Sequence, residues 1–137
     1  MKNINFLILA LFFLLQMSCG TSAPIAQNND VRQTNGQIEN PDVAVSLTEH
    51  LRKISGIYVR GNGRNAQITI RGAASMTSGT EPLFVVDGRV ISGGFQTVVE
   101  FVSVASIDKI RVLKNVSETG FYGANGANGV IEINLKK

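Results

Sequence analysis

The sequence predicts an α+β fold, in which a small mixed or antiparallel sheet of about five strands packs with two or three short helices. The first observation is an uninterrupted apolar run over 83–86, typical of a strand covered on both faces. The second is the strict alternation of polar and apolar residues over 67–71, which predicts a half-buried strand. The third is the helical spacing of Leu47, Leu51 and Ile54. Both periods occur in one domain, so the helices are expected to be interspersed with the strands.

Residues 1–19 have the pattern of a signal peptide. Lys2 supplies the positive start, and the apolar run over 4–15 is shorter than the roughly 18 residues that a spanning helix needs. The single cysteine, Cys19, follows a small serine and precedes a glycine, an arrangement that resembles a bacterial lipobox. We therefore predict lipidation of Cys19. The alternative is a soluble secreted protein that is cleaved near Ala23.

Residues 20–41 are rich in Thr, Ser, Ala, Pro, Gln and Asn, with little apolar surface to bury. This composition predicts a flexible tether, which would hold the next domain roughly 25 Å from a membrane. No acidic residue directly follows Cys19, which favours a domain that faces the periplasm. The folded domain is expected over 42–137.

The charge of the chain does not indicate nucleic-acid binding. Lys2 lies in the leader, so 12 of the 13 Lys and Arg residues remain against 10 acidic residues. This excess is mild and is expected to be evenly spread. The nearest approach to a basic cluster is Arg60, Arg64 and Arg71 around a glycine-rich turn. These residues form either a solvated loop or a contact patch for an anion or a partner.

A helix is predicted over 47–55, between the capping box of Ser46 and Glu49 and the stop signal at Gly56. The only histidine, His50, lies beside its apolar stripe and has no second ligand or nucleophile nearby in the sequence, so we expect a structural or exposed role. A brief strand over 57–59 should follow.

The next segment, 61–66, matches the G-x-G-x-x-A pattern of dinucleotide sites, but that pattern requires a helix directly after it. Here the alternating strand over 67–71 follows instead. We therefore interpret the glycines as a hairpin turn, and 72–81 as an exposed loop.

The pair Asp87 and Gly88 predicts a two-residue hairpin turn that returns the chain into β-favouring residues over 89–92. The rest of the chain predicts a helix with Phe95 and Val98 on one face, strands over 107–114 and 130–137, and a possible helix over 116–122. The glycine turn over 123–129 contains Gly123, Gly126 and Gly129, to which we assign structural roles.

Four segments resemble the plug domain of TonB-dependent outer-membrane receptors, most closely the SusC-like branch, which imports glycans. They are, in family order and spacing, 68–72, 81–88, 107–114 and 121–131. The resemblance implies a plug-like domain over 42–137. In the family, the plug blocks a 22-stranded barrel and is moved by TonB through a short amino-terminal box.

Three departures from this family shape the functional hypothesis. A barrel would need more than roughly 200 further residues, whereas this sequence ends at Lys137, so we expect no transport by the chain alone. No convincing TonB box is found in 20–41. Asn125 also occupies a position where family members often carry Arg, so we do not expect the plug-to-barrel salt bridges that such an Arg implies.

The leading hypothesis is a non-enzymatic outer-membrane lipoprotein of a Gram-negative cell envelope. Its plug-like domain would contact a β-barrel or another envelope complex through its glycine-rich loops. We predict no catalytic residues, no cofactor and no metal, and we assign possible partner or ligand contacts to Arg60, Arg64, Arg71 and Asn125. One alternative is a soluble periplasmic module that binds a glycan or metal chelate at 61–66 and 72–81. Another is a truncated receptor without a function of its own.

Overall fold

The computed structural model describes residues 32–34, 36–72 and 79–137. The predicted signal peptide, Cys19 and most of the predicted tether lie outside these residues. The strands are β1 Arg32–Thr34, β2 Gln37–Glu39, β3 Ile57–Arg60, β4 Gln67–Ile70, β5 Leu83–Val86, β6 Arg89–Ile91, β7 Ile107–Leu113 and β8 Val130–Leu135. The α-helices are α2 Leu47–Lys53, α3 Gly94–Phe101 and α4 Val116–Thr119, and the 3-10 helices are η2 Gly63–Asn65, η3 Val104–Ser106 and η4 Gly120–Gly126.

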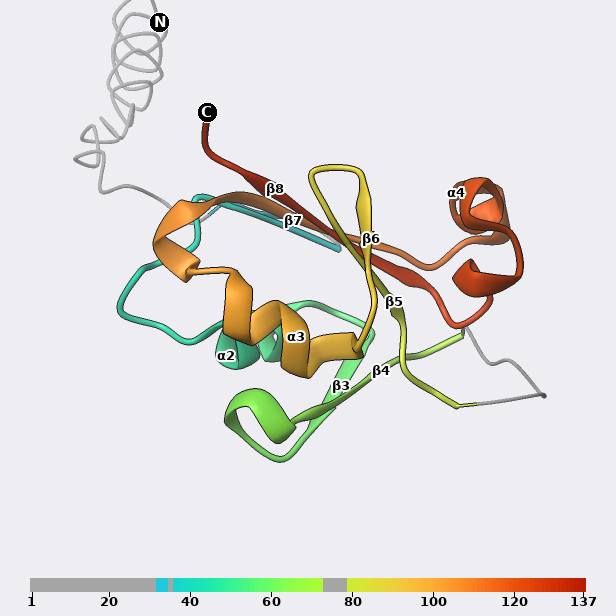
Figure 1. Ribbon diagram of the computed structural model, residues 1–137, viewed down its shortest axis with the longest axis horizontal. Helices are drawn as coiled ribbons and strands as arrows, with labels where there is room; N and C mark the ends of the chain where they lie inside the picture. Colours follow the sequence, from blue (N-terminus) through green and yellow to red (C-terminus); the bar gives the residue numbers. More distant parts are fainter. Residues whose placement is uncertain (1–31, 35, 73–78) are drawn as a thin grey trace, which may run out of the picture.

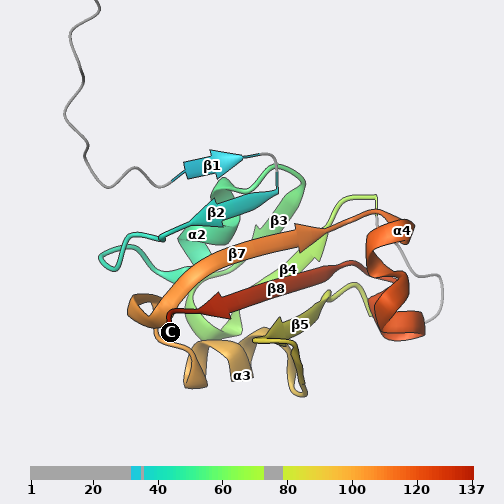
Figure 2. The same ribbon diagram turned by 90° about the horizontal axis from the view of Figure 1, so that it is seen from above.

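Six strands form the main sheet, in the order β1-β2-β7-β8-β5-β6 (Figure 2). All neighbours are antiparallel except β5 and β8, which run parallel. A parallel pair cannot be joined by a tight turn, so the chain crosses over through β6, α3, β7 and α4 before β8 pairs with β5. The mixed sheet with three short α-helices confirms the predicted α+β class.

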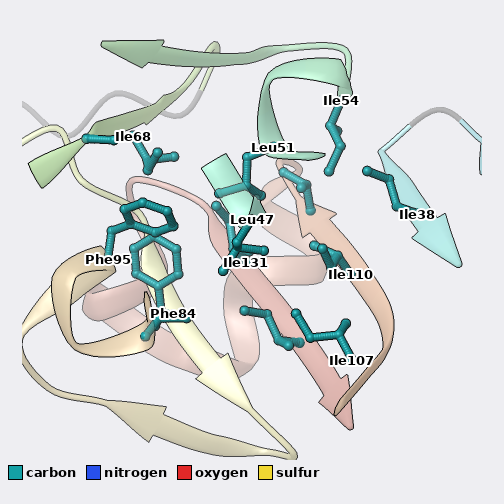
Figure 3. Close-up of a cluster of buried hydrophobic side chains, with 14 of the residues drawn as sticks. Ile38, Leu47, Leu51, Ile54, Ile68, Phe84, Phe95, Ile107, Ile110 and Ile131 are labelled. Atoms are coloured by element: carbon teal, nitrogen blue, oxygen red, sulfur yellow. The ribbon is translucent and has the colours of Figure 1, made fainter. Parts of the chain in front are cut away.

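Helices α2 and α3 and the two-stranded ribbon of β3 and β4 lie on the same side of the main sheet (Figure 1). Their apolar residues close the main core over the sheet (Figure 3). Within it, the rings of Phe84 on β5 and Phe95 on α3 lie 5.7 Å apart, centroid to centroid. Ile68 and Ile70 on β4 are both buried, as their alternation predicts.

A second, smaller core lies on the opposite face of the sheet. It contains Val85, Leu113 and Val130, with Tyr122 of η4 packed against it. Because Phe84 and Val85 point to opposite faces and each is 1% exposed, β5 is covered on both sides. This confirms the interpretation of its uninterrupted apolar run.

The folded domain begins earlier than predicted. Strand β2 lies inside the segment assigned to the tether, and Ile38 pairs with Ile110 of β7 and is 1% exposed. A three-residue strand with one apolar residue shows no alternation that could be detected in the sequence. It pairs with β1 and β7, and Ile38 packs in the main core. With β1, β2 and the short return strand β6, the described part of the chain has eight strands rather than about five.

Two predicted helices are shorter than expected. Helix α2 ends at Lys53 because Ile54 takes an extended conformation and turns into the core, so the helix stops before Gly56. The segment expected as a helix over 116–122 is divided into α4 and the 3-10 helix η4, and Gly123 adopts a non-helical φ of 56°. The glycine content of 120–126 explains this break, since glycine is a poor helix former.

His50 has a structural role on the buried face of α2. Its side chain is fully buried, and Nε2 donates a hydrogen bond to the carbonyl oxygen of Asp42 at 2.9 Å. The bond attaches the segment after β2 to the helix. Its Nδ1 atom has no hydrogen-bond partner among the residues that the structure describes.

Candidate ligand and partner contact sites

Two of the predicted loops meet at a shallow hollow of about 320 Å³, between the ribbon and the start of α3. One side comes from η2 and the start of β4, and the other from the residues before β5 and the first turn of α3. The lining residues are Arg64, Asn65, Ala66, Gln67, Ile68, Thr80, Glu81, Gly93 and Gln96. The predicted contact loop at 72–81 contributes only through its last residues, and 73–78 lie outside the described part.

Glu81 fixes the wall of this hollow. The residue before α3, Gly93, has no side chain to cap the helix, and the carboxylate of Glu81 takes that place by accepting a hydrogen bond from the amide of Phe95 at 2.8 Å. The side-chain amide of Asn128 donates to the carbonyl oxygens of Gly79 and Glu81, at 3.1 and 3.3 Å. Sequence reasoning missed Glu81 because it caps a helix that begins 13 positions later.

The hollow has a polar character that suits a hydroxyl- or amide-bearing ligand. Arg64 and Glu81 supply one charge of each sign, and the amides of Asn65, Gln67 and Gln96 can donate and accept. None of the described residues that line it is aromatic, so these residues offer no ring for stacking. Within the described residues, no group of three or more His, Cys, Asp or Glu side chains could hold a metal ion.

The predicted contact residues do not form one site. Arg64 lines the hollow described above, whereas Arg71 lines a second hollow beside the end of α2. Arg60 lies on β3 opposite Gln67. Asn125 is exposed on η4, which follows α4 in the chain and lines neither hollow.

The hairpin residue Asp87 does more than form a turn. It takes a positive φ of 46°, as does Gly88 at 78°, and its amide donates to the carbonyl oxygen of Ile133 at 2.9 Å. Its carboxylate also accepts a hydrogen bond from the amide of Leu135 at 2.9 Å. Asp87 therefore attaches the β5–β6 turn to the end of β8.

We expect Asp87→Ala to lower the free energy of unfolding by about 1–2 kcal/mol, because it removes the acceptor for Leu135 and places a poorer residue at positive φ. Asp87→Asn is the matched control, since asparagine keeps an acceptor oxygen and tolerates this backbone region. Urea unfolding measures both. Equal stability of the two variants would contradict the assigned role of the carboxylate.

A second contact region is formed by α4 and η4. Tyr122 anchors it to the outer face of the sheet, where its hydroxyl donates to Glu132 at 2.8 Å and Glu132 pairs with Arg111 at 3.3 Å. Burial and the hydrogen bond to Glu132 raise the pKa of Tyr122. The hydroxyl therefore stays protonated at neutral pH, and its contribution to stability is lost only as pH rises above the ordinary tyrosine value of about 10.

The same region exposes two large apolar side chains. Phe121 is 97% exposed and Val116 is 87% exposed, although their neighbour Tyr122 is packed against the sheet. A fully exposed aromatic side chain is a candidate for contact with another protein, because aromatic side chains are enriched among the residues that protein partners bury. We name Val116 and Phe121 the apolar tip. The predicted turn residues Gly123, Gly126 and Gly129 shape the segment that carries it.

Comparison with known proteins identifies the family. The model of the TonB-dependent Receptor Plug Domain matches residues 25–130. The chain belongs to the TonB-dependent receptor plug domain family. The match begins before residue 42, in agreement with the early start of the folded domain at β1 and β2.

Two receptors show the extent of this similarity. The TonB-dependent receptor SusC of Bacteroides thetaiotaomicron is 40% identical over 124 residues, which cover 81% of this chain and 12% of that receptor. The TonB-dependent receptor P26 of Formosa agariphila is 36% identical over 74 residues, or 54% of this chain and 7% of that receptor. The chain thus spans about an eighth or less of these relatives.

Solved structures agree with the plug fold. The RagAB peptide importer in its open-open state matches 81% of this chain and 13% of that chain, with 27% identity and a TM-score of 0.63. The siderophore receptor PirA from Acinetobacter baumannii matches 74% of this chain and 17% of that chain, with 25% identity and a TM-score of 0.54. TonB-dependent receptors are transport proteins of the Gram-negative outer membrane rather than enzymes. No helix in the described residues is long and apolar enough to span a membrane.

Proposed function

We propose that this protein is a non-enzymatic outer-membrane lipoprotein whose plug domain contacts a β-barrel or another envelope transport complex from the periplasmic side. Lipidation of Cys19 would hold the domain at the membrane. The family match and the plug fold support a role beside a transport protein. The observation that carries the proposal is the apolar tip, because an exposed Phe121 on a segment anchored through Tyr122 is suited to insertion into a partner surface.

The apolar tip makes a direct prediction for partner capture. Tagged protein purified from detergent-solubilised membranes should recover a β-barrel protein, and Phe121→Ser should lower that recovery at least about tenfold, as expected for a buried aromatic anchor. Mass spectrometry of the captured proteins measures the effect.

Phe101→Ser is the matched control, because Phe101 is also exposed, at 79%, but lies on α3. Its recovery of the barrel should equal that of the unsubstituted protein. Recovery of the tagged protein alone, or equal losses with both variants, would count against the proposal.

The lipid attachment has a separate test. Intact mass of the protein purified from membranes should show a diacyl or triacyl addition that is absent from Cys19→Ala. A mass that matches cleavage near Ala23 would instead indicate a soluble periplasmic domain.

A second candidate function is supported by the hollow beside Glu81. Two loops far apart in the sequence meet there, and amide groups line it, so a glycan or a metal chelate could bind as the alternative hypothesis expects. Isothermal calorimetry with oligosaccharides and ferric chelates tests this function. Heat that disappears in Gln96→Ala would favour it, whereas partner contact alone predicts no heat.

A further inference from the structure

Positive charge is strongly separated along the sequence. Residues 50–80 contain five of the 13 Lys and Arg residues and none of the 10 Asp and Glu residues. The rest of the chain is slightly acidic, so the formal net charge of +3 arises entirely in this stretch. The excess is therefore not evenly spread, contrary to the expectation from composition.

The fold gathers most of this charge on one surface. A hollow beside the end of α2 is lined by Arg52, Lys53, Tyr58 and Arg71, and no described lining residue is acidic. Arg60 lies two positions beyond Tyr58 on β3, so both side chains project from the same face of the ribbon. We name Arg52, Lys53, Tyr58, Arg60 and Arg71 the basic face.

Most of the cations on this face have no counter-ion. Arg52 is paired with Glu49 and also donates to Asn62 at 2.7 Å, which fixes its position. In the described part of the chain, Lys53, Arg60 and Arg71 form no ion pair. Lys53 and Arg71 line the same hollow as Tyr58, which is 58% exposed, and Arg60 projects from the same face of β3.

We propose that the basic face binds the phosphate groups of an anionic lipid surface. Arginine forms paired hydrogen bonds with phosphate oxygens, and clustered Lys and Arg side chains are attracted to anionic bilayers. Tyrosine has an apolar ring and a polar end, a combination that is favourable at a membrane interface.

The inference rests on the proposed lipid attachment only for how strongly the basic face binds the bilayer in the cell. An acyl chain on Cys19 would confine the domain near the bilayer, and the high effective concentration would make a weak electrostatic contact significant. The basic face itself is present with or without that chain, so it can be tested alone.

The test uses the mature chain from residue 19 onward carrying Cys19→Ala, so that neither the apolar leader over 4–15 nor an acyl chain contributes to binding. We expect the protein to co-float with vesicles of phosphatidylcholine and phosphatidylglycerol but not with phosphatidylcholine alone. Adding Arg60→Glu and Arg71→Glu should lower the apparent affinity at least about tenfold, and raised salt should weaken binding of the parent. Excess inorganic phosphate should compete only weakly if the lipid surface is the ligand.

Arg89→Glu combined with Lys137→Glu is the matched control, since both residues are exposed and lie outside the basic face. This pair makes the same change in net charge and should retain vesicle binding. Lys53→Glu is a second variant on the basic face, and thermal unfolding verifies that each variant folds.

The proposal is overturned if vesicles with and without phosphatidylglycerol bind the protein alike, if the control pair loses as much binding, or if inorganic phosphate abolishes vesicle binding. Charge-dependent capture of an acidic protein without vesicle binding would also overturn it. These results do not depend on the mass measured at Cys19.

Discussion

Phe84→Ala is expected to lower the free energy of unfolding by about 3–5 kcal/mol, the usual cost of removing a buried phenylalanine. Phe84 lies on the strand that is covered on both faces, and its ring contacts that of Phe95 on α3. The truncation leaves a cavity between the sheet and the helix. Small domains are stable by only about 5–15 kcal/mol, so this variant should lose a large share of its stability. Urea unfolding followed by circular dichroism measures the change.

Phe121→Ala is the matched control for this experiment, because it deletes the same atoms from a ring that is 97% exposed. Its effect on stability should stay within about 0.5 kcal/mol. A similar loss in both variants would contradict the assignment of Phe84 to the main core and of Phe121 to the surface.

Gly126→Val should be the most damaging change in the α4–η4 segment, at about 2–3 kcal/mol or more. Gly126 is buried, and a Cβ atom there would lie 2.7 Å from the carbonyl oxygen of Thr119 and 3.0 Å from the Cβ atom of Tyr122. The obstruction is backbone, so the segment must shift. That shift should also weaken the hydrogen bond between Tyr122 and Glu132.

Gly120→Ala is the control for this prediction. Nothing lies within 4 Å of its added Cβ, and its backbone is helical, with a φ of −56°. We expect a neutral or stabilising effect of up to about 1 kcal/mol, because alanine favours helix and restricts the unfolded chain. If both glycine variants unfold at the same urea concentration, the packing described around Gly126 is wrong.

Local sequence patterns predicted the elements whose conformation is determined by their own residues. The apolar run of β5, the alternation of β4 and the capping box of α2 each carry a period or an end signal, and each forms the expected element. The positive φ of Asp87 and Gly88 likewise follows from turn chemistry within two residues.

The features that the sequence did not reveal depend on contacts between distant segments. Strand β2 has only Ile38 to bury and exists because β7 pairs with it. Glu81 caps a helix on the far side of a hairpin, and Asn128 reaches back to the same segment. The basic face requires the end of α2 beside the ribbon, so no linear pattern joins Lys53 to Arg71.

The proposed function depends on contact between the apolar tip and an envelope transport protein. The most direct measurement is site-specific photo-crosslinking in intact cells, with p-benzoylphenylalanine in place of Phe121 and, as control, in place of Phe101. We predict a covalent adduct with an outer-membrane β-barrel protein from position 121 and none from position 101. No protein adduct from position 121, or the same adducts from both positions, would contradict it.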